Sequence, residues 1–185
     1  RKNNELESDE IFIKKFDNDL CNNLIIDLNE FISKETLRKV NKISVSIGPA
    51  NFNASRLIVA LARTISQQIN CPINSFSSFE IMAKRIASKN NLFTNKQSFW
   101  IYKKLKRKRL IAWKYIICNN EQQNTDLVIR EIVLPKLIQE LDSKELFFEA
   151  NYEDKEDLRE ILDSSNKNFL NRSMNSWQKV LPLYP

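Results

Sequence analysis

Residues 43–69 hold the only glycine of this 185-residue chain, placed between two apolar patterns of different period. Over 43–47, isoleucine and valine alternate with serine, which predicts a half-buried strand. Gly48 and Pro49 then break the pattern. Apolar residues return at the three- and four-residue spacing of a helix over 54–69. A strand, a tight turn and a helix in this order are typical of α/β proteins.

The rest of the chain continues this alternation of strand and helix patterns. Strands are expected at 11–16, 73–76, 98–103, 109–118 and 146–150, and helices at 17–33, 80–86, 126–141, 153–162 and 167–179. Pro135 is expected to kink or divide the helix in which it lies. Because polar Asn90-Asn91 separates the two halves, we expect an N-terminal lobe over 1–94 and a C-terminal lobe over 95–185.

Composition excludes several kinds of function. The chain has no histidine, so Ser-His-Asp and Cys-His catalysis and histidine-based zinc sites are excluded. The three cysteines are far apart in sequence and predict free thiols in a reducing cytoplasm. No apolar run approaches the length of a membrane span. We expect no metal and no cofactor, and the net charge of +6 favours an acidic partner or nucleic acid.

The strongest charge run is KKLKRKR at 103–109, between the two strands expected at 98–103 and 109–118. It would form the tip of a hairpin, which is either a solvated turn or a surface that binds nucleic-acid phosphates. The candidate nucleic-acid contacts are the six basic side chains Lys103, Lys104, Lys106, Arg107, Lys108 and Arg109. A second run of charge, the acidic one at 153–157, fits the first turns of a helix better than a metal site.

The segment 43–83 resembles the TsaB (YeaZ) family. That family has an apolar strand, then GPGSFTGLR, a helix, and a short strand ending in VSSLEAL. Four positions of the loop motif match directly: Gly48, Pro49, Phe52 and Arg56. The second motif matches at Ser77, Ser78 and Glu80, with Phe79 in place of leucine, and the closing Pro182-Leu183-Tyr184 is similar to the family's P-x-Y.

The resemblance implies a two-lobed, actin-like fold of the RNase H-like (ASKHA) kind. It also implies a cytoplasmic, non-catalytic protein that forms homodimers. Such a protein binds the transferase TsaD and, with the ATPase TsaE, supports threonylcarbamoyladenosine (t6A) formation in tRNA. The family's contact is a helix bundle, which corresponds here to helices 17–33 and 54–69. The implied interface residues are Leu24, Leu28, Ala54, Leu57, Leu61 and Thr64. From the residues alone, these helix faces are either core or such an interface.

This chain also departs from the family pattern. Three family glycines are replaced by Ala50, Ala54 and Ile58, so either the loop runs at negative φ or its asparagines, Asn51 and Asn53, take the left-handed positions. The opening strands of the pattern are expected to lie before the first residue. The lost glycines weigh against a nucleotide-binding ATPase of the same fold, while nucleic-acid binding by the basic hairpin stays the main alternative.

Overall fold

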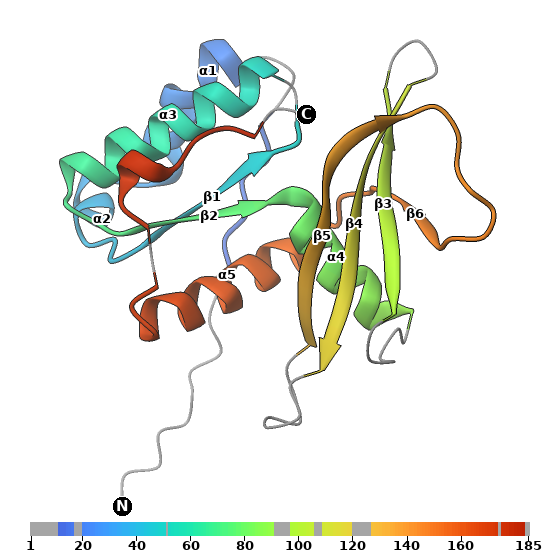
Figure 1. Cartoon of the computed structure of the whole chain (residues 1–185). Coiled ribbons are helices and arrows are strands. Elements are labelled where there is room, and N and C mark those ends of the chain that lie inside the picture. The colour runs from blue at the N-terminus through green and yellow to red at the C-terminus, as the bar shows by residue number, and fades with distance from the viewer. Residues whose placement is uncertain are drawn as a thin grey trace, which may run out of the picture. The chain divides into compact units, whose positions relative to one another are not determined.

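The computed structural model describes residues 11–16, 20–50, 52–90, 97–105, 109–119, 127–173 and 175–183, without the side chains of Phe52, Asn119 and Leu127. The chain divides into two compact units, residues 1–39 and 40–185. Figure 1 labels the helices and strands of both.

The first unit contains α1 (Leu20–Phe31) and the short α2 (Lys34–Arg38). Ser33 caps α2, since its hydroxyl oxygen accepts the backbone N–H of Thr36 at 3.1 Å. The strand expected at 11–16 is wrong, because these residues form no strand. Lys14 of this segment instead reaches α1, where it pairs with Asp27 at 3.0 Å and Glu30 at 3.3 Å.

The second unit begins with a βαβ unit that surrounds the single glycine. The strand β1 (Ile43–Gly48) leads into α3 (Phe52–Gln68), and β2 (Ile73–Ser77) returns parallel to β1. Between α3 and the two strands lies a first core of Val45, Val59, Ala62, Ile73 and Val180. The strand–turn–helix order that the sequence predicts is confirmed here.

A four-stranded sheet forms the second layer of this unit. Its strands are β3 (Ser98–Lys104), β4 (Leu110–Asn119), β5 (Leu127–Ile138) and β6 (Phe147–Glu149), in the spatial order β5-β4-β3-β6. The first three are antiparallel, and β6 runs parallel to β3. Helix α4 (Ser78–Lys89) packs on one face and forms the second core with it. This core includes fully buried Phe79 and Trp113, whose rings meet edge to face at 5.2 Å.

The segment 127–138 corrects the sequence analysis, which predicts a helix over 126–141. The structure has the edge strand β5 instead. Pro135 lies where the register with β4 shifts, between the pairs Ala112–Lys136 and Lys114–Val133. Proline is tolerated at such an irregularity of an edge strand, because no ladder hydrogen bond is required of it there.

The chain ends with α5 (Asp154–Leu170) and the 3-10 helix η1 (Trp177–Lys179). The helix expected at 167–179 is therefore wrong, since α5 extends to Leu170 and a turn follows it. The closing segment connects the two cores. Val180 is buried in the first core, and Leu183 packs against the second.

Candidate functional site

Gly48 stands where the C-terminal segment approaches β1. Its φ is +109°, a conformation that side chains other than glycine rarely adopt. A Cβ at this position would lie 3.3 Å from the carbonyl oxygen of Leu183 and 3.2 Å from the backbone nitrogen of Ala50. The backbone N–H of Leu183 donates to the carbonyl of Ile47 at 2.9 Å. The only glycine therefore lets the closing segment pack against the turn.

The turn after Gly48 is surrounded by groups of the chain itself. The carbonyl oxygen of Pro49 accepts the hydroxyls of Ser78 and Tyr152, each at 3.4 Å. Among the non-glycine residues that the structure describes, only Asn70 and Arg172 have a positive φ. At Ala50, Asn53 and Ala54 the backbone thus has negative φ, which is the first of the two expected alternatives; Asn51 lies outside the described residues. Of the matched loop residues, Gly48 and Pro49 are buried and Arg56 is exposed on α3, while the Phe52 side chain is not described.

Helix α3 packs its small and polar side on the β1–β2 sheet. The buried residues of this side are Ser55, Val59, Ala62 and Ser66. Successive helical residues turn by about 100° around the axis. The four α3 residues of the expected interface therefore lie away from this side, with Leu57 and Thr64 opposite it and Ala54 at its flank. They are Ala54, Leu57 and Leu61, which are half-buried, and Thr64, which is exposed. Leu57 and Leu61 do not belong to the side that packs on the sheet, and their role in an interface stays a prediction.

The two candidate interface residues of α1 differ in accessibility. Leu24 is buried, with 6% of its surface exposed, and Leu28 is half-buried. The exposed apolar side chains of α1 are Ile25 and Ile26, at 63% and 58%. A surface-binding role of α1 would therefore involve Ile25 and Ile26, which are not among the predicted interface residues.

The basic run at 103–109 joins β3 and β4, which form the expected antiparallel hairpin. Two of its cations already have partners within the chain. Lys103 lies 5.3 Å from the centre of the Tyr152 ring, and Lys104 pairs with Glu149 at 2.9 Å. Arg109 is exposed. The other three candidate contacts, Lys106, Arg107 and Lys108, lie outside the described residues.

Three of the hairpin's aromatic residues, Trp100, Trp113 and Tyr115, offer bases no stacking surface, whereas Tyr102 is half-buried. Trp113 and Tyr115 are fully buried, and Trp100 exposes 7% of its surface. Base stacking requires an accessible ring face. A nucleic acid at this hairpin would therefore be held mainly through its phosphates, with Tyr102 as the one partly accessible ring of β3 and β4.

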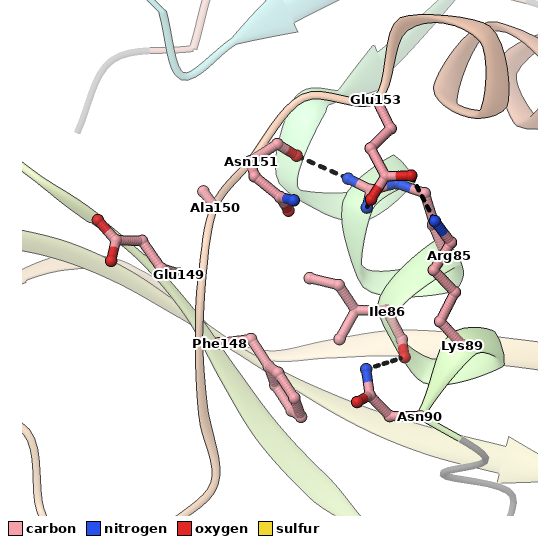
Figure 2. Close-up of a pocket in the computed structure, with 9 residues that line it drawn as sticks. All are labelled: Arg85, Ile86, Lys89, Asn90, Phe148, Glu149, Ala150, Asn151 and Glu153. Carbon is pink, nitrogen blue, oxygen red and sulfur yellow. Dashed lines mark hydrogen bonds and ion pairs between the residues drawn. The ribbon is translucent and has the colours of Figure 1, made fainter.

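A polar pocket of about 520 Å³ lies between the end of α4 and the segment that follows β6 (Figure 2). The residues that line it are Arg85, Ile86, Lys89, Asn90, Phe148, Glu149, Ala150, Asn151 and Glu153. Figure 2 shows Arg85 and Lys89 of α4 beside Glu153, while the Glu149 carboxylate points away from them.

The cations of this pocket are held by acceptors of the chain. Arg85 donates to Asp157 and Glu153, both at 2.7 Å, and to the carbonyl of Asn151 at 2.6 Å. Lys89 pairs with Glu153 and also with Glu156. The hydrogen bond from Lys89 lowers the pKa of Glu153, and the same contact raises the pKa of Lys89. The pocket is thus a structural junction of α4 and α5.

Sequence reasoning assigned the acidic residues at 153–157 to the start of a helix, which is part of their role. The carboxylate of Asp157 accepts the backbone N–H of Glu153 at 2.9 Å, at the first turn of α5. The pairing with Arg85 was missed, since 72 positions separate Arg85 from Asp157. In the part of the chain that the structure describes, no three His, Cys, Asp or Glu side chains gather in a group that could hold a metal ion. None of its described helices is long and apolar enough to cross a membrane.

Comparison with known proteins gives similarity at the level of structure. No protein-family model matches the chain, and no curated protein matches it. One solved structure from Pseudomonas aeruginosa, of a protein with similarity to peptidase YeaZ, superposes with a TM-score of 0.61 at 11% identity, over 88% of this chain and 82% of that one. YeaZ from the same organism superposes with a TM-score of 0.60 at 11% identity, over 90% and 85%. The chain therefore has the mixed α/β fold of the YeaZ structures, which is consistent with the actin-like class expected from its sequence.

Proposed function

We propose that this chain is a non-catalytic subunit of the machinery that makes t6A in tRNA. In this role it binds a TsaD-like transferase through the outer side of α3, defined by Ala54, Leu57, Leu61 and Thr64. The proposal rests on the motif resemblance around Gly48 and on the fold shared with the YeaZ structures. The observation that carries it is the placement of Leu57 and Leu61 on the side of α3 opposite its buried Ser55, Val59, Ala62 and Ser66.

The chemistry of this outer side suits contact with another helix. Fully burying one leucine side chain stabilises a contact by about 1.5–3 kcal/mol. Ala54 adds a small side chain, which permits close approach of a neighbouring helix. The Thr64 hydroxyl donates to the carbonyl of Ala60 at 2.9 Å, so its polar group is satisfied within the helix. Its methyl group is left for packing.

The remaining parts of the proposal follow from the resemblance. A TsaE-like ATPase would complete the machinery, and the same α3 surface would serve a homodimer when the transferase is absent. The site of action would be the cytoplasm, where tRNA is modified. The chain would supply no catalytic residue, so the transferase carries the chemistry.

Reconstitution tests this function. A TsaD-like and a TsaE-like protein from the same source are incubated with unmodified tRNA, threonylcarbamoyl donor and ATP, with and without this chain. We expect t6A to form only when the chain is present, as measured by mass spectrometry of tRNA nucleosides. Modification at the same rate without the chain would contradict the proposal.

A matched pair of variants distinguishes loss of the proposed contact from a general effect on α3. The Leu61→Glu variant places a charge in the proposed contact, whereas Gln67→Glu places the same group on an exposed position of the same helix. We expect t6A formation to be lost with Leu61→Glu and retained with Gln67→Glu. Equal loss in both would indicate a general effect on α3 rather than a binding surface.

A further inference from the structure

The four-stranded sheet has a second face, opposite α4, on which basic side chains gather. The strand register gives the positions of these side chains. Arg130 of β5 pairs with Ile116 of β4, and Lys114 of β4 pairs with Trp100 of β3. Lys136 pairs with Ala112 in the next row. Alternate residues of a strand share a face, so Lys104 of β3 lies on this face as well. We call these four cations, Lys104, Lys114, Arg130 and Lys136, the outer-face cations.

We propose that the outer-face cations bind the sugar–phosphate backbone of RNA. This surface differs from the α3 side in residues and in partner. RNA is chosen among polyanions because of the proposed role in tRNA modification. The assignment of the surface depends only on the charges of the outer-face cations. The RNA-binding role therefore goes beyond the contact with a transferase.

Two of the four cations lack an acidic partner. Lys104 pairs with Glu149 at 2.9 Å, and Lys114 pairs with Glu145 at 2.9 Å. Arg130 and Lys136 are exposed, and neither forms an ion pair with a described residue. The charge of Lys136 does add to the contacts of Lys114 and Trp100 that lower the pKa of Glu145. The face is therefore left positive, with two cations available to an incoming anion.

The cations stand on a fixed aromatic platform. The ammonium groups of Lys136 and Lys114 lie 5.0 Å and 5.4 Å from the centre of the Trp100 ring, and the Phe147 ring stacks on Trp100 at 5.8 Å. The indole N–H of Trp100 donates to Glu145, which also holds Lys114. Cation–π contacts and this shared carboxylate restrict the lysine side chains before binding. Ordering them on a ligand then costs less conformational entropy.

The geometry favours a polyanion over an acidic protein surface. Protein interfaces are usually centred on accessible aromatic or arginine anchors that fill pockets. Here Trp100 exposes 7% of its surface beneath the two lysines, so it offers no aromatic anchor, and Arg130 is the single arginine among the outer-face cations. Cations spread over neighbouring strands match a ligand that repeats its negative charge. Recognition through phosphates carries no base sequence preference.

Binding of an unmodified tRNA transcript to the full chain tests this inference, with fluorescence anisotropy measured over a range of salt concentrations. The double variant Arg130→Glu, Lys136→Glu removes the two unpaired cations. If each contacts one phosphate, the slope of log affinity against log salt falls by about 1.8, and affinity at low salt falls about tenfold. The control double variant Lys155→Glu, Arg159→Glu makes the same charge change at exposed positions of α5. We expect it to retain most of the binding.

Each other outcome overturns the inference. Failure of the original chain to bind tRNA at low salt would do so, as would unchanged binding by the outer-face variant. Equal loss in both double variants would show an effect of net charge alone. Tighter binding of poly-glutamate than of tRNA would make the occupant an acidic polypeptide. The single variant Lys136→Arg, in which Arg130 is unchanged, should bind tRNA about as tightly as the original chain because the positive charge is kept. Far-UV circular dichroism checks that each variant is folded. Because no transferase is added, these results are independent of whether the α3 proposal holds.

Discussion

The Nε of Arg85 donates to Asp157 Oδ1 at 2.7 Å, and only 6% and 12% of the two side chains are exposed. This contact holds the C-terminal half of α4 against the first turn of α5. Because Asp157 also accepts the backbone N–H of Glu153, the same carboxylate closes the start of α5. Two helices that are far apart in sequence are therefore fixed to each other through one side chain.

Replacing Arg85 with alanine should destabilise the chain by about 3–5 kcal/mol, since it leaves the buried carboxylate of Asp157 without its charged partner. Urea unfolding followed by circular dichroism measures the change. The control Arg159→Ala, at an exposed position of α5, should change the free energy of unfolding by less than about 0.5 kcal/mol. The double variant Arg85→Met, Asp157→Leu should recover much of the loss. If Arg85→Ala is as stable as the original chain, the Arg85–Asp157 pair contributes little to the free energy of unfolding.

Gly48→Ala should destabilise the fold and loosen the closing segment. The positive φ alone costs an alanine about 1–2 kcal/mol, and the new Cβ would lie 3.3 Å from the carbonyl oxygen of Leu183. Limited proteolysis near the C-terminus, together with urea unfolding, detects both effects. Ser46→Ala, on an exposed position of β1, is the control. If Gly48→Ala keeps full stability and protection, the close approach of Leu183 does not require glycine.

Glu80→Gln should stabilise the chain at neutral pH. Burial raises the pKa of Glu80 in the folded state, with Lys84 opposing and Glu131 adding to the shift. Between the unfolded and folded pKa values the folded state binds more protons, so stability increases as pH falls through this window. Above both values the folded chain bears the full cost of the buried charge. Unfolding curves from neutral to mildly acidic pH should show a smaller pH dependence for the variant.

A variant that is less stable at neutral pH than the original would contradict this account of Glu80. Glutamine keeps a carbonyl oxygen that can accept the hydrogen bond from the backbone of Ser77. The cap at the start of α4 is therefore retained in the comparison. Glu140→Gln, at an exposed position, serves as the control and should leave stability within about 0.5 kcal/mol.

The three cysteines should differ in reactivity toward a thiol reagent. Cys21 is exposed, Cys118 is half-buried and Cys71 is buried, where desolvation raises the pKa of its thiol. Since the thiolate is the reactive form, we expect Cys21 to be labelled first and Cys71 only when the chain unfolds. Mass spectrometry of timed samples identifies the labelled positions, and Cys21→Ser should remove the fast phase. Rapid labelling of Cys71 in the folded chain would contradict its buried placement.

The sequence predicts those elements whose apolar period is unambiguous. The strands around the basic hairpin and the strand–turn–helix at Gly48 agree with the structure because periods of two and of three to four are distinct there. The segment at 127–138 is nearly continuous in apolar residues, which fits a helix or a buried strand equally well. Its β-branched residues, Val128, Ile129, Ile132 and Val133, were the available signal for a strand.

The candidate sites depend on tertiary contacts, which sequence patterns convey less well. Periodicity selected the leucine side of α3, but the side that packs on the sheet contains Ser55 and Ser66. Packing of small residues against a strand pair leaves little hydrophobic signal. The outer-face cations share one surface only because β5 is a strand, since a helix would not align Arg130 and Lys136 with β4. Arg85 could not be paired from sequence, since several distant carboxylates are equally suitable.

Titration calorimetry with a TsaD-like protein tests the central claim most directly, that the outer side of α3 is the partner interface. Leu61→Glu should weaken binding about thirtyfold or more, as expected for a contact worth about 2 kcal/mol. Gln67→Glu, which changes an exposed position of the same helix, should bind as the original chain does. Circular dichroism confirms that both variants are folded. Equal affinity of Leu61→Glu and the original chain would contradict the account.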